Sequence, residues 1–197
     1  MSFRAVGVGV VASLLLVGAV SCAASSAPGS ADSAASRVLV RTTALPGGAL
    51  QVTRGEGFDG SGAFLAANTC DRATDYSPGL GFANVPVGTL ELAVSLVDLD
   101  TPKIHWLQLG IPATVTGLRA HMLTDGAREA LNDFGEASYD GPCPPAGTTH
   151  RYQVTLYALH DAVPGSFGRA TPPQQTLREL RQKATATASF TAPYTRH

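Results

Sequence analysis

The sequence predicts a mainly β fold, a sandwich of sheets with a few short peripheral helices. Short runs of β-branched or alternating apolar residues are separated by turn formers, with 21 Gly and 13 Pro in 197 residues. Segments with helical periodicity are scarce. With 44% apolar and only 15% charged residues, the chain is too hydrophobic and too weakly charged for a disordered protein. We therefore expect one domain with a real core.

Six strands are expected, each rich in β-branched or alternating apolar residues. They are Arg37–Thr42, Leu50–Arg54, Leu90–Val97, His105–Ile111, Arg151–Leu159 and Thr185–Tyr194. The clearest helix follows Thr171, a residue type that caps helices, and apolar residues recur at helical spacing through Ala184. Residues 127–134 are expected to form a second, short helix. No internal repeat is visible, so residues 37–197 are expected to form a single domain.

The first residues are set apart from this domain. Residues 5–20 are uncharged and apolar, too short for a comfortable spanning helix and typical of a signal-peptide core. The run ends in Ala19-Val20-Ser21-Cys22, which resembles a bacterial lipobox, although the first of these positions is usually Leu. We expect residues 1–21 to be a lipoprotein signal peptide and Cys22 to carry the lipid. The alternative is ordinary secretion, with cleavage near Ser21 to Ala24.

A tether and a cysteine pair fit this interpretation. Residues 22–36 hold the lipidated Cys and then only small residues, Pro and one Asp, which predicts a flexible tether. The domain would then be a cell-membrane lipoprotein on the extracytoplasmic side. Once Cys22 is lipidated, Cys70 and Cys143 remain as a pair in an oxidising compartment, where a disulfide would close a loop of about 74 residues. Two buried free thiols are the alternative.

Three polar residues lie at or just beyond the ends of expected strands, at positions where the alternation would place an inward-facing apolar side chain. Asp98 follows the alternation of residues 90–96, His105 alternates with the leucines of its own strand, and His150 stands just before the next strand. Residues 99–104 are too few for a parallel crossover, so the first two strands are expected to be antiparallel neighbours. That arrangement places Asp98 and His105 at the same edge of the sheet.

These side chains suggest an anion site. The loop of residues 139–147 leads into His150, and its glycines allow a ligand to approach the backbone closely. An inward carboxylate would raise the pKa of nearby imidazoles and keep them cationic, and imidazolium with loop amides would bind phosphate or carboxylate. The alternatives are a buried Asp–His pair with a structural role and a facial metal triad with open positions.

Other function classes find little support in the sequence. A net charge of −1 without a basic run argues against a nucleic-acid partner. No activated nucleophile is visible, since neither Ser61 nor Ser166 lies in a Gly-x-Ser-x-Gly motif, so we expect no enzyme activity. The sequence of residues 55–60 matches a dinucleotide fingerprint, but no convincing amphipathic helix follows it. We expect no cofactor and no bound metal.

Two sequence blocks carry a family resemblance. One is Asp98-Leu-Asp-Thr-Pro102 with His105-Trp106, and the other is Tyr139-Asp-Gly-Pro-Cys-Pro-Pro-Ala-Gly147 with His150-Arg-Tyr152. They resemble the signature blocks of the phosphatidylethanolamine-binding protein family, in its bacterial, Raf kinase inhibitor-like branch. Two departures stand out: Leu99 replaces a usual Pro, and the stretch between the first block and its His is shorter than is common.

The resemblance implies a large central sheet packed on a smaller antiparallel sheet, with a small open pocket for a phosphate-like anion or a phospholipid head group. The residues that it places in this pocket are Asp98, Asp100, Pro102, His105, Tyr139, Gly141, Cys143, Pro145, His150 and Tyr152. The leading hypothesis is a membrane-anchored binding module. The alternative is a protein inhibitor of a protease or a kinase that acts through the surface around the pocket.

Overall fold

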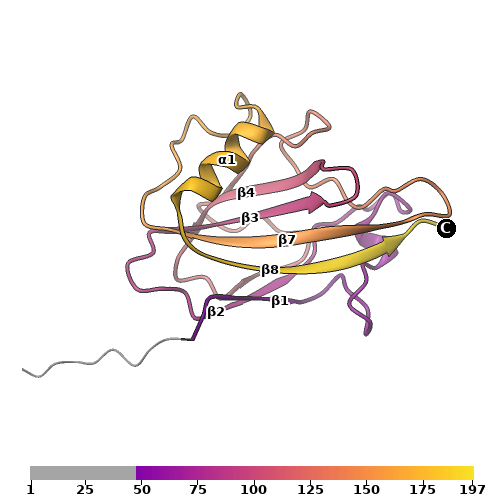
Figure 1. Ribbon diagram of the computed structural model, residues 1–197, viewed down its shortest axis with the longest axis horizontal. Coiled ribbons are helices and arrows are strands. Elements are labelled where there is room, and N and C mark those ends of the chain that lie inside the picture. Colours follow the sequence, from indigo (N-terminus) through magenta and orange to yellow (C-terminus); the bar gives the residue numbers. More distant parts are fainter. Residues whose placement is uncertain (1–47) are drawn as a thin grey trace, which may run out of the picture. The chain divides into compact units, whose positions relative to one another are not determined.

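The computed structural model describes residues 48–197 and contains two antiparallel sheets and one α-helix (Figure 1). The expected signal peptide, the lipidation of Cys22, the tether and the strand Arg37–Thr42 lie outside the described residues and stay predictions.

The smaller sheet has three strands. They run in the order β1 (Gln51–Arg54), β2 (Leu80–Ala83) and β5 (Gly117–Leu118), and each neighbouring pair is antiparallel. A short 3₁₀ helix, η1 (Ala66–Asn68), lies between β1 and β2 in the chain.

The larger sheet has five strands, also all antiparallel. Its order is β6 (Arg128–Glu129), β4 (Ile104–Pro112), β3 (Glu91–Asp98), β7 (Thr149–Leu159) and β8 (Ala184–Thr195). The expected antiparallel pairing of the strands on either side of residues 99–104 is confirmed.

The helix α1 (Pro173–Lys183) covers the face of the larger sheet that is turned away from the smaller one (Figure 1). Alternate side chains of β3 point to opposite faces of the sheet and so contribute to two separate hydrophobic cores. Leu92, Val94 and Leu96 enter the core shared with the smaller sheet, whereas Ala93 packs in a second core with residues of α1. The fold is therefore mainly β, with a large sheet packed on a smaller one, as the sequence predicts.

Two local predictions are wrong. Residues 127–134 form the short strand β6 and turns, because the side chain of Asn132 accepts hydrogen bonds from the backbone of Phe134 and Glu136 and so competes with helical bonding. Thr171 does not cap α1: the helix begins at Pro173 without a side-chain cap, and the Thr171 hydroxyl donates to the carbonyl of Ser166.

Candidate functional site

A pocket of about 290 Å³ opens at the end of the larger sheet that lies nearest the carboxyl terminus (Figure 1). There β3 ends, β4 and β7 begin, and β8 reaches its last residues. The antiparallel pairing brings these strand ends together, as it does for Asp98 and Tyr152. The lining residues are Asp98, Thr101, Lys103, His105, Phe134, Cys143, Pro145 and His150.

Asp98 is the charged centre of this pocket. It is only 2% exposed, and its Oδ1 accepts hydrogen bonds from the backbone amides of Asp100 and Thr101 at 2.7 and 3.1 Å. Its Oδ2 accepts from the Thr101 hydroxyl and from Nδ1 of His150, both at 2.7 Å. Burial acts to raise the pKa of Asp98, but these hydrogen bonds outweigh it and hold the pKa below its usual value. The carboxyl is therefore ionised at neutral pH.

His150 depends on Asp98 for its orientation. Because the ionised carboxylate can only accept, Nδ1 of His150 is the donor in their 2.7 Å contact. The ring nitrogen Nε2 is left for a ligand, as an acceptor in the neutral ring and as a donor in the imidazolium. The side chain is 14% exposed, so solvent and small solutes reach it.

His105 reaches the pocket through an irregularity in the sheet. Leu96 pairs with Trp106 and Val97 pairs with Ile104, so His105 is the extra residue of a β-bulge. Its Nδ1 donates to the carbonyl of Asp140 at 2.9 Å. Burial lowers the pKa of His105 despite the nearby acidic groups. The sequence analysis expected a neighbouring carboxylate to keep both imidazoles cationic. This expectation is wrong for His105, which is neutral at pH 7.

Tyr152 lies beneath both imidazoles. Its ring centroid is 5.3 Å from that of His105 and 6.4 Å from that of His150. The residue is fully buried, and its hydroxyl donates no hydrogen bond to any residue within 48–197, although the backbone amide of Cys143 lies close enough to act on its pKa. Burial, and then the charge of Asp98, raise the pKa of this hydroxyl, which stays protonated and able to donate.

The loop before β7 supplies another wall of the pocket, through Cys143 and Pro145. The predicted disulfide between Cys70 and Cys143 is confirmed and fastens this loop to the segment after η1. Gly141 strengthens the same attachment, since its amide donates to Oδ2 of Asp75 at 3.0 Å. A Cβ at Gly141 would lie 2.1 Å from Oδ1 of Asp75, so only glycine allows this approach.

The structure places the ten predicted residues in several environments. Asp98, His105, Cys143, Pro145 and His150 line the pocket, and Tyr152 lies directly behind the two imidazoles.

The remaining four predicted residues lie elsewhere. Asp100 forms an exposed ion pair with Arg151 at 2.8 Å, and Pro102 is exposed outside the pocket. The amide of Gly141 is already bound to Asp75, and the Tyr139 hydroxyl donates to the carbonyl of Asn68 at 2.7 Å.

Three lining residues escaped the sequence analysis: Thr101, Lys103 and Phe134. The Lys103 ammonium lies 5.1 Å from the centroid of the Phe134 ring, which in turn packs on His105. One signal could have found Lys103, since it lies inside the first signature block of a chain whose other cationic side chains are almost all arginines. It adds a positive charge at the rim of the pocket.

Residues 48–197 hold no group of three His, Cys, Asp or Glu side chains arranged to hold a metal ion. Within the same residues, no helix has both the length and the apolar character that a membrane crossing requires.

Comparison with known proteins adds independent evidence. A family model described as phosphatidylethanolamine-binding protein matches residues 52–195 of this chain. A UPF0098 protein of Methanothermobacter thermautotrophicus is 38% identical over 120 residues, which are 55% of this chain and 78% of that protein. The UPF0098 protein YbcL of Escherichia coli is 41% identical over 95 residues, which are 42% of this chain and 52% of that protein.

Solved structures agree with these sequence matches. The crystal structure of Escherichia coli YbcL, described as a new member of the mammalian PEBP family, matches with a TM-score of 0.66 and 30% identity, over 75% of this chain and 99% of that one. A phosphatidylethanolamine-binding protein homologue from Chlamydia trachomatis matches with a TM-score of 0.65 and 26% identity, over 76% of this chain and 99% of that one.

Proposed function

Because this chain belongs to the phosphatidylethanolamine-binding protein family, we propose that its pocket beside Asp98 and His150 binds the phosphate-like group of a small anionic ligand, such as a phospholipid head group. The observation that carries this proposal is the Asp98–His150 pair, which lines the pocket beside Lys103 and is joined by a 2.7 Å hydrogen bond from Nδ1 of His150. Because Nδ1 is engaged with Asp98, Nε2 is the nitrogen of this ring that remains for a ligand.

Charge in the pocket supports the same ligand class. The ionised Asp98 holds the Nδ1 proton of His150 and so fixes this ring in the lining of the pocket. Lys103 adds a fixed positive charge at the rim. This positive charge would attract an anionic ligand.

We propose a binding role and not a catalytic one. The thiol of Cys143 is held in a disulfide, and the Thr101 hydroxyl donates to Asp98 and is not activated by an imidazole. Neither group is therefore arranged as a nucleophile beside a base.

Thermal unfolding with inorganic phosphate and with glycerol phosphate tests the proposed site. We expect both probes to raise the melting temperature of the wild-type chain in a saturable manner, and His150→Ala to abolish the increase. The exposed His160 provides the matched control, and His160→Ala should keep the wild-type response. A melting temperature that neither probe changes would overturn the proposal. A larger increase with glycerol phosphate would favour a lipid head group over free phosphate.

We also propose that the domain is an exported lipoprotein held on the extracytoplasmic face of the membrane by Cys22. The apolar run and the lipobox-like motif support this location, as does the Cys70–Cys143 disulfide, which is typical of oxidising compartments. Mass spectrometry of the protein from bacterial membranes should find a diacylglyceryl group on Cys22, and Cys22→Ala should release the protein from the membrane. Recovery of unmodified wild-type protein in the soluble fraction would contradict the anchoring.

An inhibitory role is a second candidate. Phe134 at the rim is 42% exposed and Leu99 nearby is 38% exposed, which gives a protein partner apolar surface to contact. An exported protein would meet envelope proteases more readily than cytoplasmic kinases. A protease complex that survives His150→Ala but is lost in Phe134→Ala would support this role, whereas a complex lost in neither variant would place the contact elsewhere.

A further inference from the structure

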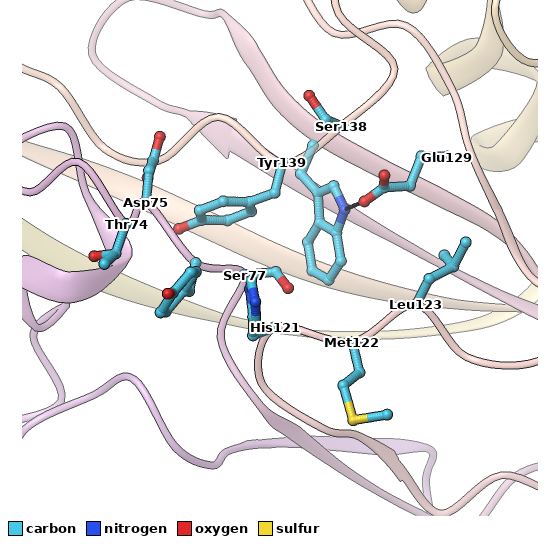
Figure 2. A pocket seen from close by; sticks show the side chains of 11 residues that line it. Thr74, Asp75, Ser77, His121, Met122, Leu123, Glu129, Ser138 and Tyr139 are labelled. Atoms are coloured by element: carbon cyan, nitrogen blue, oxygen red, sulfur yellow. Dashed lines mark hydrogen bonds between the residues drawn. The ribbon is translucent and has the colours of Figure 1, made fainter.

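A second cavity, of about 240 Å³, shares no lining residue with the pocket described above (Figure 2). Its residues come from the loop after η1, from β4 and β6, from the loop after β5, and from the segment before β7. Figure 2 shows Asp75 and Glu129 on opposite sides of the Tyr139 ring, with His121 and Met122 along the facing edge.

Aromatic rings form much of the wall. The Trp106 and Tyr139 rings meet edge to face, with centroids 5.6 Å apart and an interplanar angle of 83°. Across the cavity, the Tyr76 and His121 rings lie 3.8 Å apart. Three of these rings, those of Tyr76, Trp106 and Tyr139, are of the electron-rich kind that attracts a cation.

Two carboxyl groups give the same cavity a negative charge. Glu129 accepts the indole N–H of Trp106 at 3.0 Å, and Oδ2 of Asp75 accepts the amide of Gly141. Both carboxyl groups are partly buried, and neither has an ion-pair partner within residues 48–197. Oδ1 of Asp75 is also buried without a hydrogen-bond partner.

Burying these two carboxylates without an ion-pair partner costs free energy. Burial is the largest influence on both groups and raises the pKa of each. The Arg169 guanidinium acts in the opposite direction on Glu129, but only at a distance, and Asp140 adds a further negative charge near Asp75. A buried charge of this kind is normally paired, so the missing partner is a cation.

We propose that this cavity binds a small organic cation, an alkylammonium or quaternary ammonium group that contacts Glu129 and the aromatic wall, with the charge of Asp75 close by. Its size fits a small head group better than a drug-sized ligand. Carboxylates that face aromatic rings recognise charge and apolar surface together, which a hydrated metal ion does not offer.

The sequence contains a single Trp, and that residue, Trp106, lines this cavity and donates to Glu129. Its fluorescence therefore reports on the site directly in the folded chain. We would titrate the protein with choline, with methylammonium, and with the neutral isostere of choline in which carbon replaces nitrogen. Choline should change the emission in a saturable manner, and the isostere should bind at least about tenfold more weakly.

Charge-removing variants identify the site. Glu129→Gln keeps an acceptor for the indole and removes the charge, so it should weaken choline binding about tenfold or more. Asp75→Asn keeps an acceptor for Gly141 and serves as the second variant if the first one unfolds. Glu56→Gln changes an exposed acid outside the cavity and should bind choline like the wild type.

Tighter binding of methylammonium than of choline would identify an alkylammonium ligand, and the reverse order would identify a quaternary one. The proposal is overturned by any of three results: no saturable response to either cation, equal binding of the neutral isostere, or unchanged choline affinity in both charge-removing variants. Circular dichroism would confirm that each variant is folded.

Discussion

Replacing Asp98 with Ala removes the charged centre of the anion pocket. The carboxylate accepts four hydrogen bonds while it is only 2% exposed: two from backbone amides, one from the Thr101 hydroxyl and one from His150. Each hydrogen bond to a charged group contributes roughly 1.5–3 kcal/mol, but water entering the vacated space will replace some of them. We therefore expect Asp98→Ala to lower the free energy of unfolding by about 3 kcal/mol.

Urea unfolding, followed by circular dichroism, measures this loss. In thermal unfolding, the melting temperature of a domain of this size falls by roughly 2–4 °C for each kcal/mol of lost stability, so we expect a decrease of about 6–12 °C. Asp100→Ala is the matched control, because Asp100 pairs with Arg151 in solvent and its loss should cost much less. If both variants have the same stability, or if Asp98→Ala behaves like the wild type, the Asp98 network does not stabilise this end of the sheet.

Three further predictions follow from the structure. Replacing both Cys70 and Cys143 with Ser removes a disulfide that joins residues 73 positions apart, and the chain-entropy relation predicts a loss of about 4 kcal/mol in the free energy of unfolding. An unchanged free energy in urea unfolding would show that the disulfide does not stabilise the protein by restricting the unfolded chain. Tyr152→Phe removes a buried hydroxyl that donates to no protein group within 48–197, so the free energy of unfolding should be unchanged or higher. A clear loss of stability in urea unfolding would mean that the hydroxyl is already satisfied. Burial raises the pKa of Glu129, so its ionisation destabilises the folded state as the pH rises through that pKa. Glu129→Gln should therefore weaken the pH dependence of the free energy of unfolding without lowering stability at pH 7. A Glu129→Gln protein that is less stable than the wild type at pH 7 would show that the carboxylate is already compensated.

The sequence was sufficient to predict the mainly β class, four strands of the larger sheet and the strand ends that meet at the pocket, but not the short strands β2, β5 and β6. Alternation in residues 90–96 correctly predicted that Leu92, Val94 and Leu96 face the core shared by the sheets, whereas Leu90, on the same expected face, is 60% exposed. The short connection to His105 predicted the antiparallel pairing. Both predictions depend on the spacing of residues within a single segment of the chain. The Cys70–Cys143 pair followed from counting the cysteines that lipidation would leave.

Features that depend on contacts between segments could not be predicted. The bulge at His105 exists only as a mismatch between β3 and β4, and the occupied amide of Gly141 depends on Asp75, which lies far away in the sequence. Phe134 reaches the pocket from a segment that was expected to be helical. There the side chain of Asn132 bonds to nearby backbone amides, a local competition that hydrophobic periodicity does not reveal.

Calorimetric titration of the folded protein with phosphate tests the anion-binding claim most directly. We predict saturable phosphate binding that is lost in His150→Ala but kept in His160→Ala. Binding that His150→Ala leaves unchanged, or no measurable binding in the wild type, would contradict the account.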